Sequence, residues 1–537
     1  MDVLETTIDT RSAEYQANRA AMLALLDELN ERMAAAREGG GERAIQKMRA
    51  RGKLLPRERL ELLLDPGAPF LELSPLAAWG MYDGECPGAG HISGIGRVGG
   101  VECLLSLNDP TVKGGVIYPM TLRKTLRAQT IALENRLPMV IGVESGGANL
   151  IYQAEIFVEG GRGFANQARL SAAGVPQIAL VFGNATAGGA YVVGMSDYTV
   201  LVRGRSKVFL GGPPLVKMAT GEQVDDETLG GAELHARESG LGDYLAEDDA
   251  DAIRIGRQIV AQLKQSKPAA GQRRRQTPEE PRYDPDELLG VIPAEARIPF
   301  DMREIIARLV DGSRFLEFKR DYGPTLVTGH AFIDGYPVGM LANNGILFSE
   351  CAHKATQFIQ LCNQSRTPLI YLHNITGFMV GADYERSGII KHGSAMINAV
   401  ASATVPQFSV MVGGSYGAGN YAMCGRAYDP RFVWAWPTSR VAVMGGEQAA
   451  GVLAIVQQEA ARRKGAEPDE AAIEKLRRQT LRKFEQESTP YYATARLWDD
   501  GILDPRDTRR ALSIGLSVAH NVDYITPGAP RYGVFRM

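Results

Sequence analysis

Hydrophobic positions divide the chain into a helical start and a longer region of alternating strands and helices. Within residues 13–65 apolar side chains recur near every 3.6 residues, as at Met22, Leu25 and Leu29, and glycines 39–41 interrupt the pattern. We therefore predict an N-terminal helical segment that is broken near these glycines.

The pattern downstream of the helical segment occurs twice in the same order. Each copy predicts a strand, a helix and a second strand, at 138–143, 164–173 and 177–182 in the first copy and at 368–372, 395–403 and 407–412 in the second. Strands that alternate with helices indicate βαβ units and a mostly parallel sheet. A repeat of this size indicates a duplicated domain and not a solenoid.

Glycine-rich turns follow the predicted strands at matched places. The first strands end at Ser145-Gly146-Gly147 and at Thr376-Gly377, and the second strands end in the small-residue turns 183–190 and 413–420. Gly147 and Gly189 are 42 residues apart, and so are Gly377 and Gly419. A polar, Pro-rich stretch separates the copies, so we predict domains at 1–265 and 286–537 joined by a linker at 266–285.

The backbone of these turns can bind a negatively charged oxygen. A strand that ends in glycine and opens a helix presents free backbone N–H groups, and the helix dipole adds positive potential there. Two such groups aimed at one point stabilise an enolate oxygen. We interpret Gly188/Gly189 and Ala418/Gly419 as two oxyanion holes. The alternative is that these residues only permit tight turns; phosphate binding is disfavoured because neither turn matches GxxxxGK[ST] or GxGxxG.

Composition narrows the function classes. A net charge of −3 gives no reason to expect nucleic acid or an anionic membrane as a partner. Five scattered cysteines without a CxxC indicate reduced thiols and argue against a metal site, and no run approaches the roughly 20 apolar residues of a membrane span. The acidic N-terminus predicts no signal or transit peptide, so a bacterial cytoplasm is the expected location.

Side-chain catalysts are not apparent in the sequence. There is no HExxH, and none of the seven histidines lies in a recognisable triad. One basic segment, 49–59, contains Arg51 and Lys53, which could meet the phosphates of coenzyme A, although an ordinary charged helix start is the better explanation of this segment taken alone. If the chain is an enzyme, its catalysis must come from backbone dipoles and from a cofactor that another subunit supplies.

Several motifs together resemble the β subunits of biotin-dependent acyl-CoA carboxylases. They are Arg-Gly-Lys-Leu-Leu-Pro-Arg-Glu-Arg at 51–59, Thr-Ala-Gly-Gly-Ala-Tyr at 186–191, Phe-Leu-Gly-Gly-Pro-Pro-Leu-Val-Lys at 209–217, Asn-Ile-Thr-Gly-Phe-Met-Val-Gly at 374–381, Gly-Gly-Ser-Tyr-Gly-Ala-Gly-Asn at 413–420 and Val-Met-Gly-Gly-Glu-Gln-Ala-Ala at 443–450. The resemblance runs from about Arg11 to Met537 and is stronger to the methylcrotonyl-CoA and geranyl-CoA branch than to the propionyl-CoA branch.

The resemblance implies an α/β fold of two tandem crotonase-like domains, and a ligase that moves the carboxyl group of carboxybiotin onto an acyl-CoA. It implies that the Gly188/Gly189 amides hold the thioester oxygen and that the Ala418/Gly419 amides hold the biotin ureido oxygen. Further implied contacts with the CoA ester are Arg51, Lys53, Ser145, Gly146, Gly147, Ala148, Gly211 and Gly212. Implied contacts with biotin are Thr376, Gly377, Phe378, Tyr416 and Gly417.

The resemblance also implies partners. The chain has no Ala-Met-Lys-Met biotin acceptor and no ATP-grasp glycine loop, so it is expected to need a separate biotin-bearing α subunit. A homo-oligomeric core, a β hexamer within an α6β6 assembly, is implied because the family places its site across two β subunits. 3-Methylcrotonyl-CoA, and with it leucine degradation, is the first expectation. Geranyl-CoA or propionyl-CoA stays open because the segment between Asn149 and Asn166 is shorter than the methylcrotonyl-type stretch.

Three rival functions remain at this stage. A biotin-dependent acyl-CoA decarboxylase subunit of a sodium pump would share the fold and run the chemistry backwards. A crotonase-type hydratase or isomerase would need a carboxylate beside the enolate hole, and the turn 183–190 carries none. A non-catalytic scaffold would tolerate substitution of either glycine pair.

Overall fold

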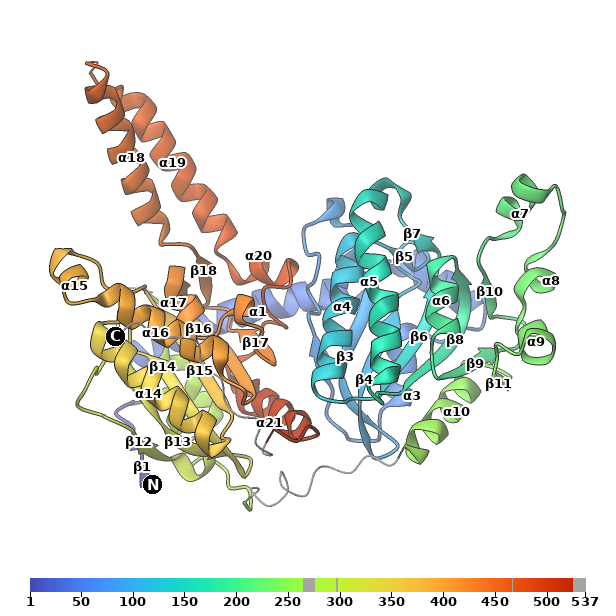
Figure 1. Cartoon of the computed structure of the whole chain (residues 1–537), viewed down its shortest axis with the longest axis horizontal. Coiled ribbons are helices and arrows are strands. Elements are labelled where there is room, and N and C mark those ends of the chain that lie inside the picture. The colour runs from blue at the N-terminus through green and yellow to red at the C-terminus, as the bar shows by residue number, and fades with distance from the viewer. Residues whose placement is uncertain (264–275, 296–297, 466, 525–537) are drawn as a thin grey trace.

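The computed structural model describes residues 1–263, 276–295, 298–465 and 467–524 (Figure 1). Two eight-stranded sheets dominate it, one in each half of the chain. The predicted linker at 266–285 lies partly outside the described residues, which resume at Gln276. The division of the chain at residue 265 stays a prediction.

The first sheet has the strand order β11-β9-β8-β6-β4-β3-β2, with β10 beside β8. Its strands are β2 (Leu71–Leu73), β3 (His91–Val98), β4 (Val101–Asn108), β6 (Met139–Ser145), β8 (Gln177–Thr186), β9 (Tyr198–Val202), β10 (Lys207–Phe209) and β11 (Tyr244–Ala246). All pairs from β4 to β11 are parallel, and only β2 and β3 add an antiparallel edge. This confirms the mostly parallel sheet that the alternating pattern predicts.

The second sheet repeats this order. Its strands are β1 (Asp2–Val3), β12 (Arg314–Glu317), β13 (Leu326–Ile333), β14 (Tyr336–Asn343), β15 (Leu369–Ile375), β16 (Gln407–Tyr416), β17 (Phe432–Ala435) and β18 (Arg440–Ala442). The parallel part runs β14-β15-β16-β17, with β18 beside β16. The centre of β15 is fully buried, which explains why it is a continuous apolar run and not an alternating one.

Helices cover the sheets in equivalent places (Figure 1). The N-terminal segment holds α1 (Ala13–Arg37), α2 (Glu42–Ala50) and α3 (Pro56–Leu63). The main helices of the first half are α4 (Pro119–Glu134), α5 (Gln153–Ala172), α6 (Gly188–Gly194), α7 (Pro213–Thr220) and α10 (Asp249–Gln262). Those of the second half are α14 (Ser349–Ser365), α16 (Ile389–Ser402), α17 (Gly417–Ala422), α18 (Gly446–Arg463), α19 (Glu470–Glu487), α20 (Pro490–Ala495) and α21 (Thr508–Ala519). In each half two long helices pack together on the sheet, α4 with α5 and α14 with α16.

The predicted elements have the right type but often the wrong ends. The helix predicted at 164–173 is the last part of α5, which begins at Gln153. Strands β8 and β16 continue to Thr186 and Tyr416, beyond the predicted ends at 182 and 412, because β10 and β18 supply backbone partners for these extra residues. The helical segment breaks after Arg37, as the glycines at 39–41 predict.

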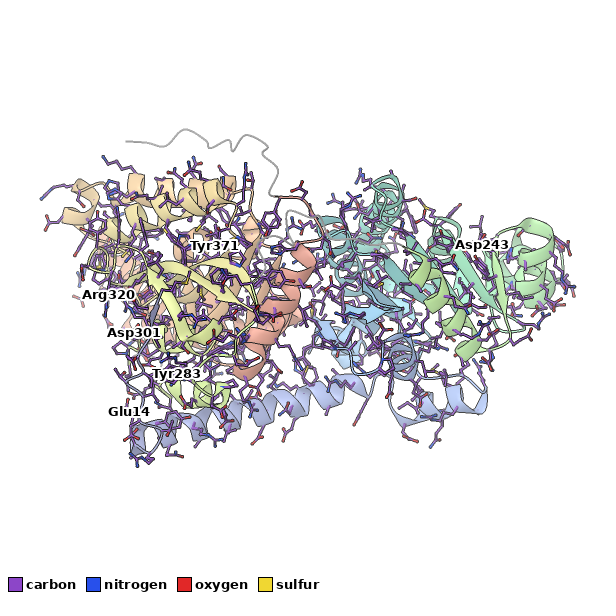
Figure 2. The ribbon with its side chains drawn as sticks, turned by 90° about the horizontal axis from the view of Figure 1, so that it is seen from below. Glu14, Asp243, Tyr283, Asp301, Arg320 and Tyr371 are labelled. Atoms are coloured by element: carbon purple, nitrogen blue, oxygen red, sulfur yellow. The ribbon has the colours of Figure 1, made fainter. Side chains whose placement is uncertain are left out.

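Helix α1 is not confined to the first half. Figure 2 shows it lying along the underside of the second half from Glu14 towards the first half. Near its start the Arg19 guanidinium pairs with Asp286 at 3.0 Å, and just after its end the Gly40 N–H donates to the Thr111 hydroxyl at 3.0 Å. The beginning of the chain therefore bridges both halves, which sequence position alone does not indicate.

Candidate functional site

The turn between β8 and α6 presents free amides at the surface of the first half. Ala187 has φ +53°, a left-handed conformation that costs an L-residue energy and marks functional turns. Its N–H donates to the Phe209 carbonyl at 3.1 Å, and its own carbonyl accepts from the Ala190 N–H at 3.0 Å. Gly188 and Gly189 are the first two residues of α6, so their N–H groups have no acceptor within the helix.

The end of β6 supports this turn. A Cβ placed on Gly189 would stand 3.6 Å from the Ser145 Cβ, so the two residues are in van der Waals contact range. The Ser145 hydroxyl accepts from the Gly147 N–H at 3.1 Å, and β7 (Gly147–Ala148) pairs with β5 (Val116–Ile117). The structure thus brings the predicted segment 145–148 beside the Gly188/Gly189 turn.

The other predicted residues for the CoA ester are more dispersed. Gly212 is the N-cap residue of α7, and a Cβ on it would lie 3.4 Å from the ring of Phe209. The backbone carbonyl of Phe209 accepts the hydrogen bond from the Ala187 N–H of the first turn. The Lys53 ammonium lies 2.5 Å from a Glu144 oxygen and is largely buried, whereas Arg51 is exposed. Lys53 therefore lies near the first turn but in an ion pair, and its contact with coenzyme A stays a prediction.

The turn between β16 and α17 repeats the first turn 230 positions later along the chain. The β-sheet register supports this equivalence, because Ser145 lies opposite Ala185 in the first half and Ile375 lies opposite Ser415 in the second. Gly417 has φ +56°, matching the left-handed Ala187. Ala418 is exposed, and its N–H is a free first-turn amide of α17, as that of Gly419 is.

The end of β15 packs tightly below the second turn. A Cβ on Gly419 would stand 2.5 Å from Ile375 Cγ2 and 3.7 Å from Gly377 Cα, so only glycine fits without movement of a neighbour. The Phe378 ring lies against Gly393 of α16, and Thr376 is exposed beside it. The predicted biotin residues 376–378 and 416–417 therefore gather around the Ala418/Gly419 amides.

Two groups of polar residues near the turns were missed by the sequence analysis. Below the second turn, His373 Nδ1 lies 2.9 Å from the Ser415 hydroxyl, which also accepts from the Asn420 amide at 2.8 Å. Below the first turn, the buried Arg59 pairs with Glu144 at 3.0 Å and with Asp249 at 2.8 Å. A comparison of the two copies at equal offset would have singled out the first group as polar residues in apolar surroundings.

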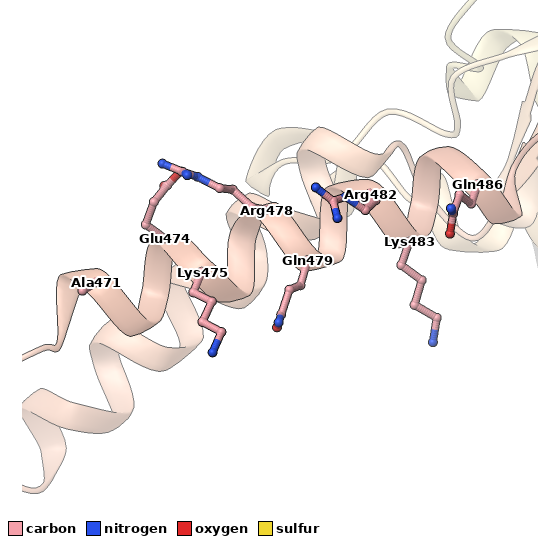
Figure 3. Close-up of a pocket in the computed structure, with 8 residues that line it drawn as sticks. All are labelled: Ala471, Glu474, Lys475, Arg478, Gln479, Arg482, Lys483 and Gln486. Atoms are coloured by element: carbon pink, nitrogen blue, oxygen red, sulfur yellow. The ribbon is translucent and has the colours of Figure 1, made fainter.

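The two turns lie in different lobes of the chain, α6 in one and α17 in the other (Figure 1). A hollow of about 560 Å³ lies elsewhere, along the outer face of α19 (Figure 3), lined by Ala471, Glu474, Lys475, Arg478, Gln479, Arg482, Lys483 and Gln486. This surface holds long polar side chains and no element of either turn, so it does not contribute to the candidate site.

The described residues were compared with two simple patterns, a cluster of metal-ligating side chains and a membrane-spanning helix. No group of three or more His, Cys, Asp or Glu side chains there is arranged to bind a metal ion. Among the same residues, no helix combines the length and apolar character that crossing a bilayer requires.

A duplicated α/β domain with one amide-lined turn in each half is the architecture of a carboxyltransferase acting on acyl thioesters, and the carboxyl transferase domain family matches residues 47–531. The chain belongs to this family. It is 57% identical over the full length of both chains to the probable biotin-dependent acyl-coenzyme A carboxylase beta2 subunit of Mycobacterium tuberculosis.

Further comparisons agree with this assignment. The chain is 55% identical to the biotin-dependent 3-methylcrotonyl-coenzyme A carboxylase beta1 subunit of the same organism, over 96% of this chain and 97% of the relative. The crystal structure of the P. aeruginosa geranyl-CoA carboxylase beta subunit superposes with a TM-score of 0.91 and 51% identity, over 100% of this chain and 99% of that one. The chain is therefore the carboxyltransferase component of a biotin-dependent acyl-CoA carboxylase, and its halves have the expected crotonase-like fold.

Proposed function

We propose that this subunit carboxylates 3-methylcrotonyl-CoA, with geranyl-CoA as the second candidate substrate. The observation that carries the mechanism is the matched pair of turns, each with two free amides at the start of a short helix. The relative at 55% identity acts on the first acyl group and the superposed structure on the second. These similarities support the branched or prenyl-like acyl class but do not separate its two members.

In this mechanism the chain supplies hydrogen-bond donors and no side-chain base. The Gly188 and Gly189 amides donate to the thioester oxygen and stabilise the charge that develops when the substrate becomes an enolate. With a 3-methylcrotonyl group the proton leaves the γ carbon, so the double bond relays the charge to this oxygen. Loss of one such donor costs about 2.7–4 kcal/mol of transition-state stabilisation.

The second turn fits the ureido group of biotin. Its two first-turn amides belong to the exposed Ala418 and the buried Gly419, and a neutral ureido oxygen is an acceptor that such donors bind. When bound, carboxybiotin supplies the CO2 and a ureido nitrogen that takes the substrate proton. The Ala418 and Gly419 amides hold the ureido oxygen as charge develops on it.

We further propose that the complete site forms between two copies of this chain, because α6 and α17 lie in separate lobes. Large apolar side chains beside both turns are highly exposed in the single chain: Leu150, Ile151, Phe157 and Val158 near the first, and Val380, Ile390 and Val443 near the second. Exposed apolar surface of this kind marks interfaces. We propose a β hexamer with a biotin-bearing α subunit, in a bacterial cytoplasm, as the family resemblance implies; the exposed apolar side chains support contact between copies of this chain.

The test is co-expression with a biotin carboxylase/carrier subunit, followed by ATP-dependent fixation of labelled bicarbonate. Acetyl-, propionyl-, 3-methylcrotonyl- and geranyl-CoA are compared at equal concentration, and a preparation without the partner serves as the control. Fixation with 3-methylcrotonyl-CoA alone supports the proposal and a role in leucine degradation. Preference for geranyl-CoA selects the second candidate, and fixation with none of the four by a biotinylated complex contradicts both.

A further inference from the structure

A chain of buried polar side chains lies directly below the second turn. The Ser415 hydroxyl, at the end of β16, is 2.9 Å from His373 Nδ1 on β15 and 2.8 Å from the Asn420 amide nitrogen on α17. His373 and Ser415 are both 0% exposed. The two neighbouring strands β15 and β16 and the helix α17 are thus tied together through one hydroxyl group.

The donor and acceptor groups of these side chains limit the directions that their hydrogen bonds can take. The Asn420 NH2 group can only donate, so the Ser415 oxygen accepts from it. The Ser415 hydroxyl hydrogen can then donate to His373 Nδ1, an arrangement in which the histidine proton sits on Nε2. Burial lowers the pKa of His373 to about 4, so the ring is neutral near pH 7 and one of its nitrogens can accept a hydrogen bond.

A Ser–His pair can also act as a nucleophile with its base, but burial argues against this here. Neither Ser415 nor His373 exposes any surface through which a substrate carbonyl could approach. Of the two amides of the second turn, that of Ala418 belongs to an exposed residue, whereas Gly419 is buried behind it. The three hydrogen-bonded side chains therefore hold the turn in place and do not contact the substrate.

The first half shows that the fold itself does not need these polar groups. At the equivalent positions, 230 residues earlier, it has Val143, Ala185 and Ala190, and it still forms the same strand, left-handed residue and short helix. Burying the His373 and Ser415 side chains, with Asn420 half-buried beside them, costs free energy unless these groups are hydrogen-bonded. A feature that the fold can dispense with in one half points to a task that is specific to the other.

We propose that Asn420, Ser415 and His373 are positioning residues that fix the Ala418 and Gly419 amides in the second oxyanion hole. This inference rests on the proposed function of that hole. In the proposed function the ureido group is carried by a separate subunit, and donors that are already fixed in place need no ordering when it binds. Preorganised donors need no rearrangement during reaction, and a displacement of about 1 Å can cost about 100-fold in rate.

The test uses the complex of this chain with its biotin-bearing partner. The single variants Ser415→Ala and Asn420→Ala introduce the residues that the first half carries at these positions. We expect kcat for carboxylation to fall about 10- to 100-fold, with the KM for acyl-CoA changed less than about twofold, because the first hole is intact. In carboxyl transfer from the carboxylated acyl-CoA to free biotin, we expect the KM for biotin to rise.

The histidine provides a rescue experiment. His373→Asn retains an acceptor near the position of Nδ1, whereas His373→Val, the residue of the first half, removes it. We expect the asparagine variant to retain most of the wild-type kcat and the valine variant to lose it. A role in packing alone predicts the opposite order, since valine is the natural residue at the equivalent apolar position.

Ser106→Ala is the matched control, because Ser106 makes an equally buried hydrogen bond of 2.9 Å to His91 in strands that do not contact the second turn. It should lower the melting temperature and leave kcat unchanged. If Ser415→Ala and Asn420→Ala behave like this control, the inference is wrong. If Gly419→Ala also leaves kcat unchanged, the proposed hole is wrong as well, so the two failures are distinguishable.

Discussion

At the scale of single residues, the two turns differ in how much space they leave for a side chain at their glycine. Around Gly419 the Ile375 side chain and the Gly377 backbone fill the position of a Cβ, whereas around Gly189 the nearest atom to that position is 3.6 Å away, an ordinary contact. The second turn is therefore the more tightly packed of the two. Substituting Gly419 should therefore reduce carboxylation more than substituting Gly189.

We predict that Gly419→Ala lowers kcat by about tenfold or more, because the new methyl group would stand 2.5 Å from Ile375 Cγ2 and displace the second-hole amides. Gly189→Ala should retain kcat within about threefold, since its methyl group fits. Steady-state carboxylation by the two variant complexes measures this. Ile375→Ala combined with Gly419→Ala should recover part of the loss; equal losses in both single variants would contradict the packing argument.

Two buried histidines should make the protein sensitive to acid. Burial lowers the pKa of His91 to about 3 and that of His373 to about 4. Below about pH 6.5 the unfolded chain binds protons that the folded chain does not, so the free energy of unfolding falls by up to about 1.4 kcal/mol per pH unit for each histidine.

Urea unfolding between pH 7 and pH 5 at fixed protein concentration measures this loss. His373→Asn should remove the contribution of His373 and flatten the profile relative to the unmodified chain. An unchanged slope in that variant would mean that His373 does not remain neutral in the folded state.

At the scale of elements, the segment from α2 to α3 joins the first half through buried charges. Arg59 on α3 contacts Glu144 at the end of β6 and Asp249 at the start of α10, and Lys53 shares Glu144. Since Glu144 precedes Ser145, this network anchors the strand end that supports the first turn. Arg51, two residues before Lys53 in the chain, is exposed.

We predict that Arg51→Gln raises the KM for acyl-CoA about fivefold, as expected for the loss of about 1 kcal/mol of phosphate binding, with little change in stability. Lys53→Gln should instead lower the melting temperature, because it leaves part of the Glu144 charge uncompensated. Steady-state kinetics and thermal unfolding of both variants separate the two roles. An unchanged KM for Arg51→Gln would remove this residue from the CoA site.

At the scale of the whole molecule, one ion-paired cluster joins the two halves. Arg127 on α4 binds Asp500 through two hydrogen bonds of 2.9 Å, and Arg426 also pairs with Asp500 at 2.8 Å. Asp500 is fully buried, and the two arginines hold its pKa well below the usual range despite that burial. A continuous apolar core extends across the same boundary, from Leu104 and Met139 to Phe408 and Trp434.

We predict that Asp500→Asn lowers the free energy of unfolding by about 3–5 kcal/mol, because it leaves two largely buried guanidinium groups without their shared carboxylate. Chemical denaturation at pH 7 measures the change. Asp504→Asn, at an exposed pair with Arg506, is the control and should cost less than about 1 kcal/mol. A similar small effect for Asp500→Asn would show that the cluster does not hold the halves together.

Local pattern explains which parts of the fold and site were predictable. Apolar runs such as that of β15 and the glycine turns after β8 and β16 are short-range features, so the strands, the repeat and the two amide pairs follow from them. The ends of β8 and β16 did not, because the partner strands β10 and β18 are remote in sequence. The roles of the candidate site residues at 145–148 and 376–378 are implied by motif resemblance and stay predictions.

What the sequence by itself determined is the duplicated α/β architecture, the two turns and the family, since each depends on residue order over a few tens of positions. The tertiary structure alone decided which side chains lie below and beside the turns. The hydrogen bond from Ser415 to His373 spans 42 residues, and that from Arg127 to Asp500 spans 373. Such contacts depend on strand register and helix packing, which bring distant residues together and which no local pattern encodes.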